Sequence, residues 1–155
     1  MANFATSLTL PTEAQTAALA GRIAPLLRAG DAVLLSGPIG AGKSFFARAL
    51  IRARIGNPAE EVPSPSFTLV QTYVADDVEI WHCDLYRLTT ALDISELGLE
   101  DAFAQAICLI EWPDRLGPLA PPKALHLTFA ARTDHHSIDI QGDASWAARL
   151  EPAIA

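Results

Sequence analysis

Residues 37–44 read Gly-Pro-Ile-Gly-Ala-Gly-Lys-Ser, and this stretch decides the expected fold. It matches the pattern G-x-x-x-x-G-K-[ST] at every fixed position, which is the pattern of a phosphate-binding loop (P-loop). Glycines let successive backbone amides turn inward around phosphate oxygens without a side chain in the way. Lys43 is then expected to reach the β- and γ-phosphates of a nucleotide, and the Ser44 hydroxyl to bind Mg²⁺.

The segments on either side of the loop fit this interpretation. Residues 31–36 (DAVLLS) form a short apolar run between two glycines, which is typical of a buried central strand. Residues 45–55 follow a strong helical pattern that Gly56 closes. A helix starting near Lys43 adds the positive end of its dipole to the anion site. The absence of an Asn-Lys-x-Asp guanine-binding motif favours ATP over GTP.

Strands and helices alternate over the first two-thirds of the chain, which predicts an α/β fold with a mixed central sheet. Helices are expected from Thr12, whose Thr-x-x-Gln stretch has the form of a capping box, and at 93–103 with a break at Gly98. Pro25 should kink or shorten the first helix near Gly21. Further elements are expected as strands at 4–10, 107–112, 124–130 and 137–141, a hairpin of 66–74 with 78–84, and a last helix at 144–150. Residues 113–122 hold four prolines and are predicted to be mostly loop.

The composition predicts one globular domain over residues 1–155, since 50% of the residues are hydrophobic and 19% are charged. A net charge of −7 argues against independent RNA binding, which requires Lys and Arg to neutralise phosphates. Cys83 and Cys108 match no metal-ligand spacing and are expected to be reduced thiols on buried strands. No basic leader and no apolar run of about 18 residues is found, so no membrane contact is expected and the cytoplasm is the expected location.

Two carboxylates are candidates for the acidic partner that a P-loop enzyme needs near its Mg²⁺ ion. Asp84 and Glu111 each end an apolar run that is expected to form a strand. Either could hold the metal while the other positions water, and the local sequence does not decide between them. Either could instead cap the next helix or pair with Arg87 or Arg115.

Two further features have both a functional and a structural interpretation. Residues 64–68 (SPSFT) place three hydroxyls in a proline-stiffened segment, where P-loop proteins have nucleotide-sensing switch loops. The alternative is an ordinary turn leading into an edge strand. His82 could act near the γ-phosphate or be a hydrogen-bonded core residue, and His135 with His136 is expected in a solvated turn.

These motifs, in this order, resemble those of the TsaE (YjeE) family of ATPases. The matching stretches are Gly-Ala-Gly-Lys-Ser at 40–44, Ser-Pro-Ser-Phe-Thr-Leu-Val at 64–70, His-Cys-Asp-Leu-Tyr-Arg-Leu at 82–88 and Ile-Glu-Trp-Pro at 110–113. A P-loop alone is generic, whereas the last two motifs together are highly specific. The resemblance extends over about residues 10–116 and is weaker in the two C-terminal strands.

The resemblance implies an Mg²⁺-dependent ATPase subunit, binding ATP and ADP, that acts with the TsaB and TsaD proteins. That assembly installs threonylcarbamoyl on adenosine 37 of tRNAs whose codons begin with A, and TsaD is the subunit that performs the transfer. This chain would contact tRNA only indirectly, through the complex, which agrees with its acidic charge. We expect weak hydrolysis by the chain alone, because no arginine finger is evident and such a group contributes about 10³- to 10⁵-fold.

Carried over by position, Ser44 and Glu111 would bind Mg²⁺, and Asp84 would position or activate the attacking water. Lys43 would act with Asp84 in catalysis. Contacts to the nucleotide would come from the loop, the first helix and the residue after Glu111, namely Thr12, Gly37, Ile39, Gly40, Ala41, Gly42, Lys43, Ser44, Phe45 and Trp112.

Two positions depart from the family pattern. Pro38 stands where the family commonly has Asp and removes one backbone N–H, and Cys83 replaces a usual aromatic residue. Two other functions compete with the ATPase: a P-loop small-molecule kinase, and a nucleotide-gated interaction module that does not hydrolyse. Kinases usually close an arginine-bearing lid over the phosphates. The candidate lid at 89–103 is acidic and has no Arg or Lys, which disfavours the kinase.

Overall fold

Seven strands form one mixed sheet in the computed structural model, which describes residues 3–88 and 90–154. Met1, Ala2, Thr89 and Ala155, which include the first residue of the candidate lid, lie outside the described residues. The sheet order is β1-β7-β6-β2-β5-β4-β3. The strands are β1 (Asn3–Leu10), β2 (Ala32–Ser36), β3 (Val70–Ala75), β4 (Val78–Asp84), β5 (Ile107–Glu111), β6 (Leu125–Ala131) and β7 (His136–Asp143). The central strands β6, β2, β5 and β4 are parallel, and β7 and β3 run antiparallel to their neighbours, which confirms the mixed sheet.

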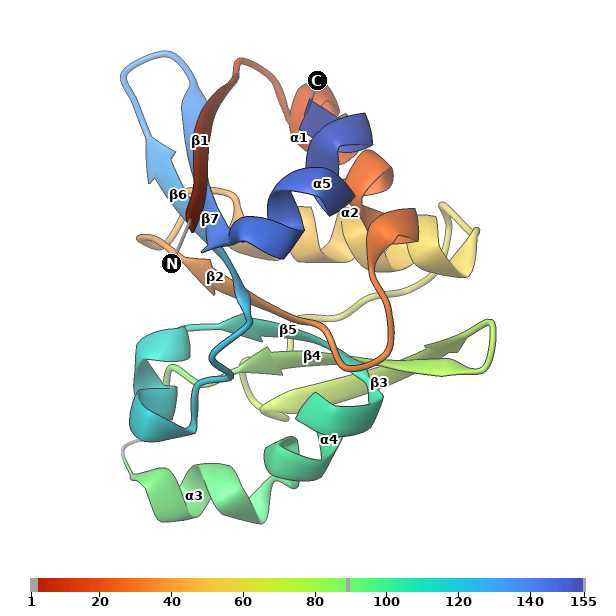
Figure 1. Cartoon of the computed structure of the whole chain (residues 1–155), viewed down its shortest axis with the longest axis vertical. Coiled ribbons are helices and arrows are strands. Elements are labelled where there is room, and N and C mark those ends of the chain that lie inside the picture. Colours follow the sequence, from red (N-terminus) through yellow and green to blue (C-terminus); the bar gives the residue numbers. More distant parts are fainter. Residues whose placement is uncertain (1–2, 89, 155) are drawn as a thin grey trace.

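Helices cover both faces of this sheet, so the chain has three layers (Figure 1). The α-helices are α1 (Glu13–Ile23), α2 (Lys43–Ile55), α3 (Ala91–Glu96), α4 (Leu99–Gln105) and α5 (Ala144–Ile154). Two 3₁₀ segments, η1 (Ala24–Leu26) and η2 (Pro113–Leu119), complete the elements. Figure 1 shows α1, α2 and α5 on one face and α3 and α4 on the other. Among the described residues, no helix combines the length and apolarity needed to cross a bilayer.

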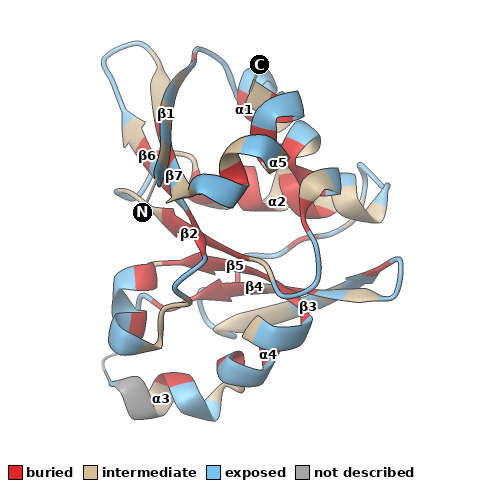
Figure 2. Cartoon of the chain, in the orientation of Figure 1, coloured by how far each residue is buried: buried red, intermediate tan, exposed pale blue. Residues whose placement is uncertain are grey.

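Strand β2 lies between two hydrophobic cores because alternate side chains point to opposite faces of a sheet. Its Val33 and Leu35 pack in the cluster that contains residues of α1, α2 and α5. Its Leu34 packs with residues of α3 and α4 instead. Figure 2 shows the resulting run of buried central strands between the helical layers. This double burial explains why residues 31–36 contain so few polar side chains.

The predicted hairpin forms, but its first strand begins four residues later than expected. β3 starts at Val70, whereas residues 66–69 make a turn in which the Leu69 N–H donates to the Pro65 carbonyl at 2.6 Å. Leu69 has a φ of 69°, a left-handed conformation that a regular strand excludes. The hairpin closes through Asp76 and Asp77, both at positive φ, as a two-residue type I′ turn requires.

Two proline-containing segments are more regular than predicted. Residues 113–119 contain 3₁₀ turns rather than only loop, and Pro113 can open the first of them because a missing N–H costs nothing there. Gly117, with φ 52° and ψ −125°, interrupts the segment. The last helix continues past Pro152 to Ile154. Its final turn is stabilised by burial of Ala153 and by Arg22, whose Nε donates to the Ala153 carbonyl at 2.8 Å. The first helix ends as expected before Pro25, which lies in η1.

Both cysteines are free and fully buried, as predicted. Cys83 lies on β4 and Cys108 on β5, and both side chains pack in the core on the α3 and α4 side. Burial raises the pKa of Cys108 to about 12. Burial, with a smaller contribution from Cys108, also raises the pKa of Cys83 well above its usual value. Both thiols are therefore protonated and unreactive near neutral pH.

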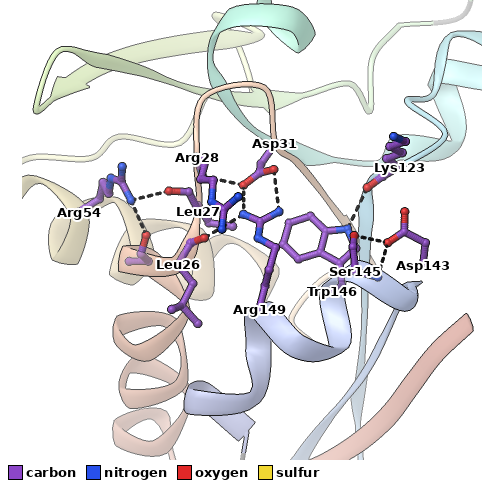
Figure 3. Close-up of polar contacts among 11 residues, drawn as sticks. Leu26, Leu27, Arg28, Asp31, Arg54, Lys123, Asp143, Ser145, Trp146 and Arg149 are labelled. Atoms are coloured by element: carbon purple, nitrogen blue, oxygen red, sulfur yellow. Dashed lines mark hydrogen bonds and ion pairs between the residues drawn. The ribbon is translucent and has the colours of Figure 1, made fainter.

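An ion pair attaches the last helix to the segment that leads into β2 (Figure 3). The Arg149 guanidinium donates to both carboxylate oxygens of Asp31, at 3.1 and 2.5 Å, and to the Leu26 carbonyl at 2.9 Å. Asp31 also accepts from the Arg28 backbone N–H at 2.6 Å. Because both partners are mostly buried, this bidentate pair fixes where β2 begins.

Candidate active site

The parallel strands β2, β4 and β5 end at the same edge of the sheet, and their ends bring the candidate residues together. β2 ends at Ser36 and leads directly into the loop. In the pairing of β4 with β5, Asp84 lies opposite Glu111. Ligands of open α/β sheets bind at such carboxyl ends. The fold therefore places both carboxylates beside the glycine-rich loop.

The loop turns sharply where β2 ends, and only glycine fits at its first position. Gly37 has a φ of +135°, and a Cβ atom built there would lie 2.4 Å from the Phe129 carbonyl oxygen. The side chain of Pro38 is exposed, and its carbonyl accepts from the Ala41 N–H at 3.2 Å. The proline therefore leaves the turn of the loop intact.

Lys43 is a buried lysine at the first position of α2. Its Nζ donates to the Gly37 carbonyl at 2.6 Å and lies 3.6 Å from the centre of the Trp112 ring. Burial lowers the pKa of Lys43, and the negative charges of Glu111, Asp84 and Asp114 oppose that shift. The ammonium is thus held across the mouth of the loop by a carbonyl and an aromatic face.

Glu111 is the most buried carboxylate of the site and connects two elements. Its Oε1 accepts from the Ser44 hydroxyl at 2.8 Å, and its Oε2 lies 2.7 Å from His82 Nε2. Burial alone would raise the pKa of Glu111. The hydrogen bond and charge of His82, with smaller contributions from Ser44 and Lys43, outweigh burial and hold that pKa below its usual value. Glu111 is therefore ionised at neutral pH.

Asp84 has different partners, which come from the loops. Its Oδ1 accepts from the Tyr86 backbone N–H at 3.0 Å, and its Oδ2 accepts from the Ser66 hydroxyl at 3.3 Å. Ser66 is also 2.7 Å from the Ser64 hydroxyl. The predicted switch segment therefore reaches the site through Asp84, and it also leads into the edge strand β3. Within residues 3–88 and 90–154 neither acid pairs with an arginine, since Arg87 donates to the Phe67 carbonyl and Arg115 to the Tyr86 carbonyl.

These side chains surround a cleft of about 560 Å³. Most residues predicted to bind nucleotide, metal or water line it, namely Ile39, Gly40, Gly42, Lys43, Ser44, Phe45, Asp84, Glu111 and Trp112. Of the other loop residues, Gly37 contributes its carbonyl to Lys43, and the Ala41 side chain is buried in the core. Trp112 adopts a left-handed backbone conformation, with φ 59° and ψ 54°, that turns the chain out of β5.

A family model described as "Threonylcarbamoyl adenosine biosynthesis protein TsaE" matches residues 10–139. The chain belongs to the TsaE family. A relative from Rickettsia conorii, named tRNA threonylcarbamoyladenosine biosynthesis protein TsaE, is 41% identical over 123 residues, which cover 79% of this chain and 70% of that protein. A relative of the same name from Aquifex aeolicus is 39% identical over 110 residues, covering 70% and 77%.

A solved structure, that of Bacillus subtilis YdiB, has a similar fold. It superposes with a TM-score of 0.81 at 23% sequence identity and covers 99% of this chain and 96% of that one. At this identity the comparison supports the arrangement of strands and helices and nothing finer. The family assignment made from the motifs is confirmed by the sequence relatives.

Six residues that line the cleft of this TsaE-family chain were not among the predicted site residues. Ser66 and Phe67 belong to the predicted switch segment, and the other four are Glu13, Tyr86, Arg87 and His136. Tyr86 and Arg87 lie two and three residues after Asp84 within the 82–88 motif, so their position in the motif was an available signal. His136 had no such signal, because it reaches the cleft through the pairing of β6 with β7. The prediction of a solvated turn is therefore wrong for His136, which begins β7. His135 does lie before the strand and pairs with Asp134 at 2.7 Å.

Thr12 does not line the main cleft. Its hydroxyl caps α1 by accepting from the Gln15 N–H at 3.2 Å, which confirms its role at the helix start. It also lines a second recess, of about 360 Å³, formed with residues 132–136. Glu13 and His136 line both spaces, so the recess adjoins the cleft. A nucleotide contact by Thr12 would have to come through that recess.

The donor set near the loop fits Mg²⁺ better than a transition metal. Ser44 and Glu111 present oxygen atoms, which are the ligands that Mg²⁺ prefers. No group of three or more His, Cys, Asp and Glu side chains within residues 3–88 and 90–154 could hold a metal ion by itself. Mg²⁺ at nucleotide sites takes one or two protein ligands together with water and phosphate oxygens.

Proposed function

We propose that this chain is an Mg²⁺-dependent P-loop ATPase that supports threonylcarbamoyl modification of adenosine 37 in tRNA, together with TsaB and TsaD. The observation that best supports the ATPase is the contact between Ser44 and Glu111 beside a buried Lys43. This contact joins the hydroxyl of the loop to the carboxylate at the end of the neighbouring strand. The names of the relatives support the tRNA modification.

Each residue has a proposed role in binding or positioning. Loop amides would bind phosphate oxygens, and Lys43 would neutralise charge on the β- and γ-phosphates. Ser44 and Glu111 would hold Mg²⁺, which when bound supplies charge neutralisation of the phosphates. Asp84, already oriented by the Tyr86 N–H and the Ser66 hydroxyl, would accept a hydrogen bond from the attacking water.

The surface around the cleft is consistent with a partner that covers it. Ile39 is 81% exposed and Phe67 is 83% exposed, so a partner that covers them would bury two large apolar side chains. Both line the cleft. The acidic chain would leave tRNA contacts to the partner proteins. The cytoplasm remains the proposed location, because the proposed assembly acts on tRNA.

Measurement of ATP turnover with and without TsaB and TsaD tests this function. We expect slow release of phosphate by the chain alone, clear stimulation by the pair, and binding to the pair that depends on ATP. Unchanged, undetectable hydrolysis in both conditions would instead indicate a nucleotide-gated module. ATP consumption that requires a small-molecule acceptor would indicate a kinase.

The two acids should differ in how they affect metal dependence. Glu111→Gln should raise the Mg²⁺ concentration for half-maximal turnover by about 10-fold or more, because it replaces a charged ligand with a neutral amide. Asp84→Asn should mainly lower the turnover at saturating Mg²⁺, because Asp84 contacts the switch segment rather than Ser44. Titration of turnover against Mg²⁺ measures both effects, and the reverse ranking would exchange the two proposed roles.

A further inference from the structure

His82 is a fully buried histidine, and its hydrogen bond to Glu111 has no part in the proposed function. It lies on β4, two residues before Asp84, and has no exposed surface. Its Nε2 is 2.7 Å from Glu111 Oε2. It does not line the cleft, so it lies behind Glu111 as seen from the nucleotide side. Its lack of exposed surface disfavours direct contact with the phosphates.

The pairing of β4 with β5 explains how the two side chains meet. His82 lies opposite Leu109 in the register, and Asp84 lies opposite Glu111. Residues two apart on a strand point to the same face, so His82 and Glu111 are diagonal neighbours on the face toward α2. The contact is thus fixed by the central sheet rather than by a loop.

Glu111 is the one hydrogen-bond partner of the His82 side chain among the described residues. The other ring nitrogen, Nδ1, is buried and makes no hydrogen bond within the part of the chain that the structure describes. Burying a polar ring costs free energy that an apolar residue of similar size would avoid. Packing therefore does not account for histidine at this position, whereas the bond to Glu111 does.

The two oxygens of Glu111 have separate partners. An ionised carboxylate only accepts hydrogen bonds, so the shared proton belongs to His82 Nε2. Oε2 is then held by the ring, and Oε1 remains directed at the Ser44 hydroxyl. A glutamate side chain has several rotatable bonds, and this anchor restricts them before any metal binds.

We infer that His82 is a positioning residue that holds Glu111 in the orientation needed to bind the metal ion. The inference rests on the proposed function, since it assigns to Glu111 the role of an Mg²⁺ ligand. Partners that hydrogen-bond a ligating carboxylate commonly change metal affinity by about 10- to 100-fold when removed. His82 acts through Glu111 and touches neither nucleotide nor metal.

The test compares three variants of the full chain. His82→Leu removes the donor at similar volume, and His82→Gln retains an N–H donor near the position of Nε2. Ile80→Val is the matched control, because Ile80 is equally buried on the same strand and face but packs in the apolar core. Binding of Mn²⁺ in the presence of ADP is followed by electron paramagnetic resonance. Binding of a fluorescent ADP analogue in EDTA reports nucleotide affinity without metal.

We expect His82→Leu to weaken Mn²⁺ binding about 10- to 100-fold while nucleotide affinity in EDTA stays within about 2-fold. His82→Gln should recover most of the Mn²⁺ affinity, and Ile80→Val should match the wild type. The ¹⁵N shifts of the His82 ring in the unmodified protein should show the proton on Nε2. This last measurement needs no variant to fold and no metal.

Two results would overturn the inference alone. One is equal Mn²⁺ affinity in His82→Leu and the wild type, which leaves the proposed ATPase intact. The other is a ring with no proton on Nε2, which is incompatible with donation to Glu111. If the wild type itself binds no Mn²⁺ with ADP, the proposed function fails and the inference fails with it. Failure of the inference about His82 can therefore be distinguished from failure of the proposed function.

Discussion

Lys43→Ala is expected to lower ATP turnover by at least about 10²- to 10³-fold, the usual effect of removing one group that stabilises transition-state charge. Lys43 is the cation at the entrance of the loop, and its ammonium is held by the Gly37 carbonyl and the Trp112 ring. No other lysine or arginine lies within the loop sequence, and Arg87, which also lines the cleft, donates to the Phe67 carbonyl. Steady-state phosphate release, measured with TsaB and TsaD present, quantifies the loss.

Lys123→Ala is the matched control for this experiment. Lys43 and Lys123 are the two lysines of the chain, and Lys123 is exposed, away from the residues that line the cleft. Its side chain can be removed without changing the hydrogen bond that its backbone carbonyl accepts from Trp146. Wild-type turnover in the Lys43→Ala variant would refute the assignment of the loop as the ATP site.

Gly37→Ala is expected to destabilise the protein by about 3 kcal/mol or more. The added Cβ would lie 2.4 Å from the Phe129 carbonyl oxygen, and a backbone atom of a central strand cannot rotate away. The φ of +135° adds strain for any residue with a side chain. Urea denaturation, followed by circular dichroism, measures the change in the free energy of unfolding.

Gly40→Ala separates the two causes of this effect. Gly40 also has a positive φ, +85°, but a Cβ at that position would meet nothing within 4 Å. Gly40→Ala should therefore lower the free energy of unfolding only by the cost of the left-handed backbone conformation, about 1–2 kcal/mol. Equal destabilisation by the two substitutions would show that the clash with Phe129 does not determine the requirement for glycine at position 37.

The sequence allowed good prediction of β2, the loop and α2 because their signals are local. An apolar run, a glycine-rich turn and a helical pattern follow one another within 25 residues, 31–55. The start of β3 was predicted wrongly because Leu69 adopts a left-handed conformation with no glycine to indicate it. The turn depends on a bond to Pro65 and on the bond from the Asp84 N–H to the Leu69 carbonyl, which is a contact between distant residues.

In the candidate site, too, features with a local signal could be predicted and features that depend on distant contacts could not. Asp84 and Glu111 could both be identified as strand-end acids, yet their local sequences gave no way to tell them apart. Their different partners, Ser66 for one and Ser44 for the other, depend on which strand lies next to β2. His136 was missed for a related reason, because only the pairing of β7 with β6 brings it to the cleft.

The order of strands also bears on how the chain folds as it is synthesised. β1 pairs with β7, and the start of β2 is anchored by Arg149 of the final helix. A nascent chain on the ribosome would contain the complete loop long before these distant segments emerge. Pairings of such large sequence separation form slowly. The proposed ATP site should therefore be complete only once β7 and α5 have emerged, and a shorter nascent chain should not bind ATP.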